Sequence, residues 1–146
     1  MLKILFRLLF LLMMAWTGIA PADLVLIANA GTAVNNISRE EAANIYMGRL
    51  RRFPSGATAQ PLDLPSDSTE KSLFYHLLIN KDLSDVEAYW ARLIFSGRVS
   101  PPRTVVSLKE VVENVAREPN VIGYVDRSIV DNRVRIIMEL QAEGVR

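Results

Sequence analysis

The sequence predicts an α/β domain with a mostly parallel sheet that is flanked by helices. Short apolar segments indicate buried strands, and the segments between them carry apolar residues at helical spacing. Strands that alternate with helices are typical of a largely parallel sheet with helices on both faces. The chain of 146 residues is long enough for one domain with a substantial core.

Residues 1–22 are predicted to be a signal peptide. Lys3 and Arg7 precede an apolar stretch that ends in the small-residue pattern Ala-Pro-Ala at 20–22. That stretch has about a dozen apolar or small residues, whereas a membrane-spanning helix needs roughly 20. An uncleaved membrane anchor is the alternative. The domain proper is therefore expected to be residues 23–146, exported to the periplasm.

Composition excludes several kinds of site. Removing the predicted signal peptide takes away two of the 17 basic residues and none of the 16 acidic ones, which leaves a net charge of −1. The chain has no cysteine, so it forms no disulfide, thiolate metal site or cysteine nucleophile. An exported chain without cysteine is typical of a bacterial periplasmic protein that relies on its core.

The first predicted elements are a strand at 24–28 and a helix that begins with a capping box. In the box, the Ser38 hydroxyl and the Glu41 carboxylate satisfy free backbone N–H groups. Gly48 is well placed to end this helix. The segment AQPLDL at 59–64 follows as a candidate second strand.

The remaining elements are three helices and two strands. The first of these helices follows Ser68, and further capping boxes at Ser84 and Ser107 are predicted to start the other two. The Ser84 helix is expected to bury residues that include Trp90 and Ile94. Apolar segments predict strands at NVIGYV, 120–125, and at RVRIIMEL, 133–140.

No catalytic constellation is recognisable, so the chain is predicted not to be an enzyme and to need no metal or cofactor. The single histidine, His76, has no carboxylate at metal-ligand spacing. Ser68 has no nearby base, and no Gly-x-Ser-x-Gly elbow occurs.

A basic cluster and an aromatic cluster are each of a kind found in nucleic-acid-binding proteins, but a solvated loop and a hydrophobic core explain them better. The arginine-rich segment RLRR at 49–52 is expected to be a solvated loop, because the chain is predicted to be exported. Tyr89, Trp90 and Phe95 fall at helical spacing and are expected to belong to the core rather than to a base-stacking platform. No nucleic-acid partner is predicted.

A polar segment, Ser66 to Thr69, precedes the helix at Ser68 and has two interpretations. A helix N-terminus presents free N–H groups and partial positive charge, so it can bind a phosphate-like anion, and the Ser68 and Thr69 hydroxyls could add donors. Alternatively, Asp67 is the N-cap and Glu70 lies at N3, and these carboxylates compete for the same donors. Asp67, Ser68, Thr69 and Glu70 are therefore the candidate anion-binding residues.

Three segments together resemble phosphate-type ABC-transporter substrate-binding proteins, the PstS-like family. They are ISREEAANIYMGRLRRFPSG (37–56), YWARLIFSGRVSPP (89–102) and REPNVIGYVD (117–126). Arg49 and Phe53 stand where the family usually has Lys and Trp. The resemblance implies a type 2 periplasmic-binding-protein fold. Full-length members clamp their ligand between two lobes, and the length of this chain corresponds to a single lobe.

The resemblance also bears on the anion site. Family members carry Ser-Gly-Thr at the start of this helix and an Arg four residues earlier. Ser68 matches the Ser, whereas Thr69, Glu70 and Leu64 stand at the Gly, Thr and Arg positions. Losing the Arg removes charge-assisted bonds worth roughly 1.5–3 kcal/mol each. Thr32, after the first strand, is a weaker candidate for a ligand-contacting hydroxyl, and an ordinary loop threonine is the alternative.

The expected function is therefore that of an exported, non-enzymatic, solute-binding-like protein that binds phosphate or another small oxyanion weakly. The alternative is a ligand-free interaction module that docks on a membrane transporter or sensor. Self-association is a further alternative, because a homodimer could rebuild a two-lobed cleft.

Overall fold

The computed structural model describes residues 22–141. The predicted signal peptide lies outside the described residues, apart from Ala22. Among residues 22–141, no helix combines the length and the apolar character that crossing a membrane requires.

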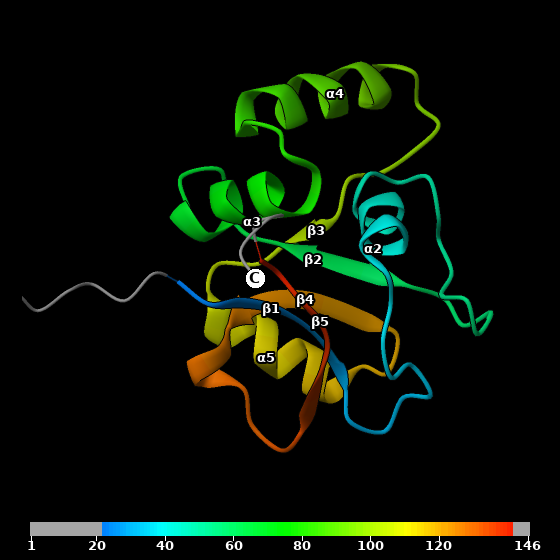
Figure 1. Cartoon of the computed structure of the whole chain (residues 1–146). Coiled ribbons are helices and arrows are strands. Elements are labelled where there is room, and N and C mark those ends of the chain that lie inside the picture. Colours follow the sequence, from blue (N-terminus) through cyan, green and yellow to red (C-terminus); the bar gives the residue numbers. More distant parts are fainter. Residues whose placement is uncertain (1–21, 142–146) are drawn as a thin grey trace, which may run out of the picture.

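The described residues form one five-stranded sheet and four α-helices (Figure 1). The sheet order is β3-β2-β4-β1-β5. In chain order the elements are β1 (Leu24–Asn29), α2 (Arg39–Tyr46), β2 (Gln60–Asp63), α3 (Thr69–Ile79), α4 (Leu83–Phe95), β3 (Arg103–Thr104), α5 (Leu108–Arg117), β4 (Val121–Asp126), the 3-10 helix η1 (Arg127–Ile129) and β5 (Val134–Glu139).

The mostly parallel sheet is confirmed, with β1 as the strand that runs against the others. β2 pairs in parallel with β3 and with β4. β1 pairs antiparallel with both β4 and β5, so the other four strands share one direction. The two-residue strand β3 was not predicted, since it is too short to leave a hydrophobic pattern.

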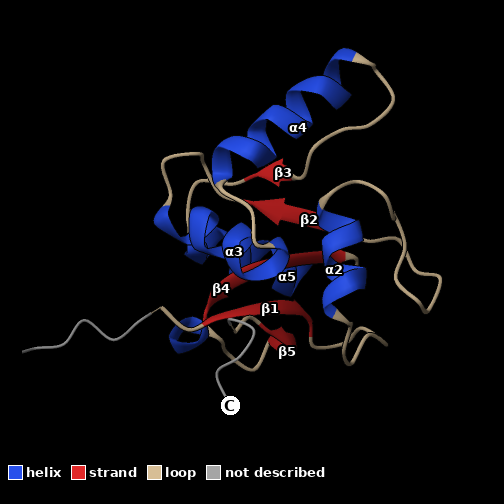
Figure 2. Cartoon of the chain, turned by 45° about the horizontal axis from the view of Figure 1, so that its top comes forward, coloured by secondary structure: helices blue, strands red, loops and turns tan. Residues whose placement is uncertain are grey.

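Helices cover both faces of the sheet, as predicted (Figure 2). On one face, Phe74 of α3 stacks on Tyr124 of β4, with ring centroids 3.9 Å apart and planes 9° from parallel. On the other face, α5 packs against β4 at Gly123, where an added Cβ would lie 2.3 Å from Cγ1 of Val111. Successive side chains of a strand point to opposite faces of the sheet, so residues 123 and 124 of β4 contact helices of different layers.

Of the three predicted capping boxes, the structure contains the one at Ser38, only the N-cap at Ser107, and neither feature at Ser84. The box at Ser38 is confirmed, because Glu41 N donates to Ser38 Oγ and Ser38 N donates to Glu41 Oε2 at 2.7 Å. Ser107 is also an N-cap, although Glu110 accepts from the N–H of Val106 instead of from the cap residue.

The box at Ser84 is wrong. Helix α4 begins at Leu83, its N-cap is Asp82, and within the described residues that cap makes no side-chain bond. Ser84 therefore lies inside the first turn. An acid there, Asp85, still favours this helix end through the dipole.

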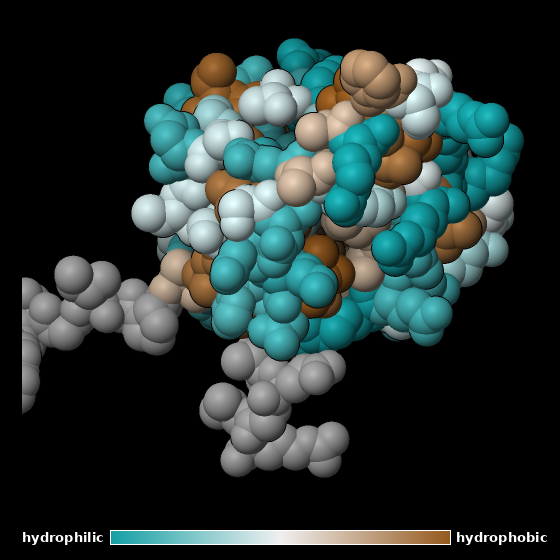
Figure 3. Space-filling model, turned by 90° about the horizontal axis from the view of Figure 1, so that it is seen from above, coloured by the Kyte–Doolittle hydropathy of each residue, from teal (hydrophilic) through white to brown (hydrophobic). Residues whose placement is uncertain are grey.

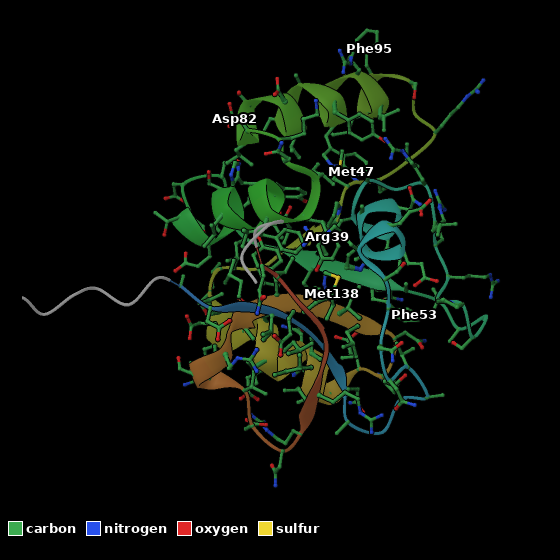
Figure 4. All side chains as sticks on the ribbon, viewed as in Figure 1. Arg39, Met47, Phe53, Asp82, Phe95 and Met138 are labelled. Carbon is green, nitrogen blue, oxygen red and sulfur yellow. The ribbon has the colours of Figure 1, made fainter. Side chains whose placement is uncertain are left out.

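The predicted burial of Ile94 and Phe95 is also wrong. Ile94 is 53% exposed and Phe95 is 96% exposed, whereas Val86 and Trp90 of the same helix are buried. Phe95 projects away from the body of the protein (Figure 4). Helical spacing identifies residues that share a face, but it does not tell how far along the helix the contact extends.

Gly123→Ala should lower the free energy of unfolding by about 1–3 kcal/mol, because the new methyl group overlaps Val111 and forces α5 away from β4. Urea unfolding measures this. In a Val111→Ala background the same glycine change should cost little. Equal costs in both backgrounds would contradict the packing described here.

Candidate functional site

The start of α3 is capped by Ser68 and not by Asp67. Ser68 has extended backbone angles, and its Oγ accepts a hydrogen bond from Lys71 N at 3.2 Å. Asp67 lies in an exposed turn that is closed by a bond from Ser68 N to Pro65 O at 3.0 Å. The expectation that Asp67 is the N-cap, with Glu70 at N3, is therefore wrong, because the helix begins one residue later.

Glu70 occupies donors at this helix start with its own carboxylate. Its Oε2 accepts from the hydroxyls of Ser68 at 2.9 Å and Thr69 at 3.3 Å. A bond from its own backbone N–H lowers the pKa of Glu70 most, and the Ser68 bond lowers it further. Glu70 is therefore charged at neutral pH, and its stabilising contribution is lost only as the pH falls through that lowered pKa.

The charges around the helix start oppose a second anion. Asp126, at the end of β4, raises the pKa of Glu70 slightly through like-charge repulsion. Arg127, the residue after Asp126, is engaged by Asp23 at 2.7 Å and by Glu139 at 2.8 Å. A free oxyanion would thus meet resident carboxylates, one of which already holds the hydroxyl donors.

Behind the helix start lies a buried carboxylate that the sequence analysis missed. Asp63, at the end of β2, is only 4% exposed. Its Oδ1 accepts from the Tyr124 hydroxyl at 2.6 Å and from Leu64 N at 2.8 Å. Its Oδ2 accepts from the Tyr75 hydroxyl at 2.8 Å and lies 3.3 Å from the Lys71 ammonium. We call these five residues the Asp63 cluster.

In the Asp63 cluster, the charge of the buried carboxylate is balanced by Lys71 and its oxygens accept hydrogen bonds from two tyrosine hydroxyls. Burial, followed by the charge of Asp63, raises the pKa of both Tyr75 and Tyr124 well above the ordinary tyrosine value, so both remain donors. The Lys71 side chain is 12% exposed and supplies the balancing positive charge. Lys71 also donates its backbone N–H to Ser68 Oγ. The cluster therefore fixes the first turn of α3 against β2 and β4.

One sequence signal pointed to Asp63. An acidic residue between Leu62 and Leu64 of a predicted strand is unusual, because a charge seldom sits in a buried strand without a partner. The partners come from α3 and from β4, 61 positions away. Nothing in the local sequence shows that they converge.

The other predicted residues lie apart from the anion site or offer no polar side chain. Leu64, which stands where the resemblance places an arginine, is 2% exposed and belongs to the hydrophobic core. Thr32 follows the end of β1, and β1 runs opposite to β4: Leu24 pairs with Asp126. Thr32 therefore lies at the other end of the sheet from Ser68, so the two do not form one site.

The described residues hold no group of His, Cys, Asp or Glu side chains that could bind a metal ion. The chemistry available at the start of α3 is hydrogen-bond donation from two hydroxyls and a helix N-terminus. Such an arrangement suits the binding of an anionic group.

Comparison with known proteins gives matches among solved structures only. No protein-family model and no curated protein matches the chain. A structure of an ABC-type phosphate transport receptor from Vibrio cholerae matches with a TM-score of 0.64 and 19% identity, over 84% of this chain and 47% of the receptor. A putative phosphate ABC transporter substrate-binding protein with bound phosphate, from Clostridium perfringens, matches with a TM-score of 0.63 and 16% identity, over 86% and 46%.

PstS from Borrelia burgdorferi matches with a TM-score of 0.61 and 19% identity, over 86% of this chain and 49% of that one. The chain thus spans about half the length of these solved structures. The expected fold, a single lobe of a type 2 periplasmic-binding-protein-like architecture, is confirmed.

Asp63→Asn should lower the free energy of unfolding by about 3 kcal/mol or more, because it leaves the Lys71 ammonium without its balancing charge in a mostly buried position. Denaturant unfolding measures the loss. The matched control is Glu113→Gln, which removes an exposed carboxylate bound to Arg133 and should change stability little. Equal effects of the two substitutions would argue against the Asp63 cluster as a structural centre.

Proposed function

We propose that this chain is an exported, non-enzymatic, solute-binding-like domain that binds phosphate or a similar small oxyanion weakly at the start of α3. The observation that carries the proposal is the bonding of Glu70. Its carboxylate already accepts from the Ser68 and Thr69 hydroxyls. The likeness in fold to proteins described as phosphate transport receptors supports the same ligand class.

Binding of an oxyanion requires Glu70 to leave the donors. A carboxylate and a phosphate use the same hydroxyl groups and the same positive end of the helix. The incoming anion must therefore displace Glu70, and it also experiences repulsion from Asp126. With Leu64 in place of an arginine, no bidentate bond compensates for these costs. The affinity is accordingly low.

Export and a periplasmic location are part of the proposal and rest on the predicted signal peptide at residues 1–22. The absence of catalytic function rests on two arguments. The sequence offers no nucleophile with a base, and the similar solved structures are described as transport or substrate-binding proteins. A membrane transporter is the partner that these descriptions suggest.

A second candidate function is protein–protein interaction, by a domain that no longer binds a small ligand. Two observations favour it: Leu64 is buried where the resemblance places an arginine, and the chain spans about half the length of the similar solved structures. Such a domain would dock on a membrane transporter or sensor, or on a second copy of itself. A homodimer would bring two copies of this lobe together, which could rebuild the two-lobed cleft that the resemblance implies.

Glu70→Thr should raise phosphate affinity about tenfold or more, because it removes the competing carboxylate and leaves a hydroxyl at the position. Asp67→Gly should have a smaller effect, since Asp67 is exposed in the preceding turn. Titration calorimetry measures both. Adding Ser68→Ala to Glu70→Thr should reverse the gain. If Glu70→Thr leaves phosphate affinity unchanged, the polar segment is only a helix cap.

The interaction-module function predicts an oligomer or a captured partner. Sedimentation of the mature domain with and without phosphate should show a dimer, or a pull-down from periplasm should retain a membrane transporter or sensor subunit. A strict monomer that retains no partner would decide against this second function and leave the first untouched.

A further inference from the structure

A polar cavity lies away from the start of α3. It has a volume of about 480 Å³ and is lined by residues at the ends of α2 and α3 and along α4. Met47, which lines it, lies between α2 and α4 (Figure 4). α3 is 11 residues long, roughly 16 Å, and the cavity includes its last residue, Ile79, whereas Ser68 caps its first turn. The Ser68 cap and this cavity thus lie at opposite ends of α3, and Lys81 also lines a separate hollow with Thr69.

Three cations and one acid line this cavity. The cations are Arg49, Lys81 and Arg92, and the acid is Asp85, which gives a local charge of +2. Within residues 22–141, neither Lys81 nor Arg92 takes part in a salt bridge or a side-chain hydrogen bond. The Arg49 guanidinium donates one long hydrogen bond, of 3.5 Å, to Asn44 Oδ1. Cations that line one concavity and outnumber its acids raise the local concentration of anions.

The cavity also has an ordered apolar wall. Met47 and Val86 are buried, with 6% and 3% of their surface exposed. Tyr89 packs edge-on against Trp90, with centroids 5.5 Å apart, and its hydroxyl donates to Met47 O at 2.7 Å. The guanidinium of Arg49 lies 6.0 Å from the centre of the Tyr89 ring, within the range of a cation–π contact. An apolar surface of fixed position thus adjoins the three cations.

We propose that this cavity binds a small organic anion that carries two negative charges on an apolar or aromatic body, such as an aryl phosphate. The volume falls in the range of about 300–1,000 Å³ that small-molecule sites occupy, which is far larger than inorganic phosphate needs. The cations bind the charged group, and the wall at Met47, Val86 and Tyr89 takes the apolar body. This site is independent of the oxyanion site proposed at Ser68.

The proposal also accounts for part of the basic segment at 49–52. Arg52 donates to Gly56 O at 2.9 Å and so stabilises its own loop. Arg49 instead lines the cavity. Figure 3 looks down on the α4 side of the molecule, where hydrophobic residues lie scattered among hydrophilic ones.

Titration calorimetry of the whole chain with phenyl phosphate tests the proposal. We expect one saturable site whose affinity falls as salt is added, because the contacts are ionic. Phenol lacks the charges and inorganic phosphate lacks the ring, so each should bind this cavity at least about tenfold more weakly. Lys81→Ala and Arg92→Ala alter exposed side chains, so folding should be preserved, and each should weaken phenyl phosphate binding about tenfold.

Three further variants make the result specific. Asp85→Asn should strengthen binding, since it removes the opposing charge. Lys109 is an exposed cation on α5, at the other face of the sheet. Lys109→Ala and Ser68→Ala should both leave phenyl phosphate binding unchanged. The proposal is overturned by no detectable binding, by equal losses in Lys109→Ala and Arg92→Ala, or by loss of binding in Ser68→Ala. Loss of binding in Ser68→Ala would place the anion at the start of α3, and equal losses in the two cation variants would show non-specific attraction.

Discussion

The buried carboxylate of Asp63 is the interaction on which the arrangement of this domain depends. A carboxylate that is 4% exposed costs several kcal/mol unless its oxygens are satisfied. The donors come from the turn after β2, from α3 and from β4. These elements must therefore meet at one point. The same constraint sets the start of α3. The Lys71 ammonium balances the charge of Asp63, and the Lys71 backbone N–H donates to Oγ of the cap residue Ser68.

Much of the fold follows from local sequence signals, and the exceptions have physical causes. The strands at 24–29 and 121–126 and the cap at Ser38 are apparent because each depends on residues close in sequence. The Asp63 cluster is not apparent, since its donors are distant in the chain. The direction of β1 depends on pairing between distant strands, which short apolar segments do not encode.

At the candidate site, too, the sequence predicted the kind of chemistry but not the residue that provides each contact. The sequence indicated that carboxylates would compete with an anion at the start of α3, and Glu70 does hold the hydroxyls there. It assigned the cap to Asp67, because Asp and Ser are nearly equal as N-caps and stand side by side. Similarly, the aromatic spacing of α4 suggested a core helix, yet α4 buries Trp90 and exposes Phe95. The polar cavity is lined by earlier residues of α4, among them Val86 and Tyr89.

We propose that the start of α3 is a weak anion site whose donors Glu70 normally occupies. The most direct measurement is a phosphate titration followed by amide chemical shifts of the folded domain. We predict the largest shifts at the amides of Thr69, Glu70 and Lys71, appearing only at millimolar phosphate. Shifts confined to other helix starts, or no shift at these three amides, would contradict the claim.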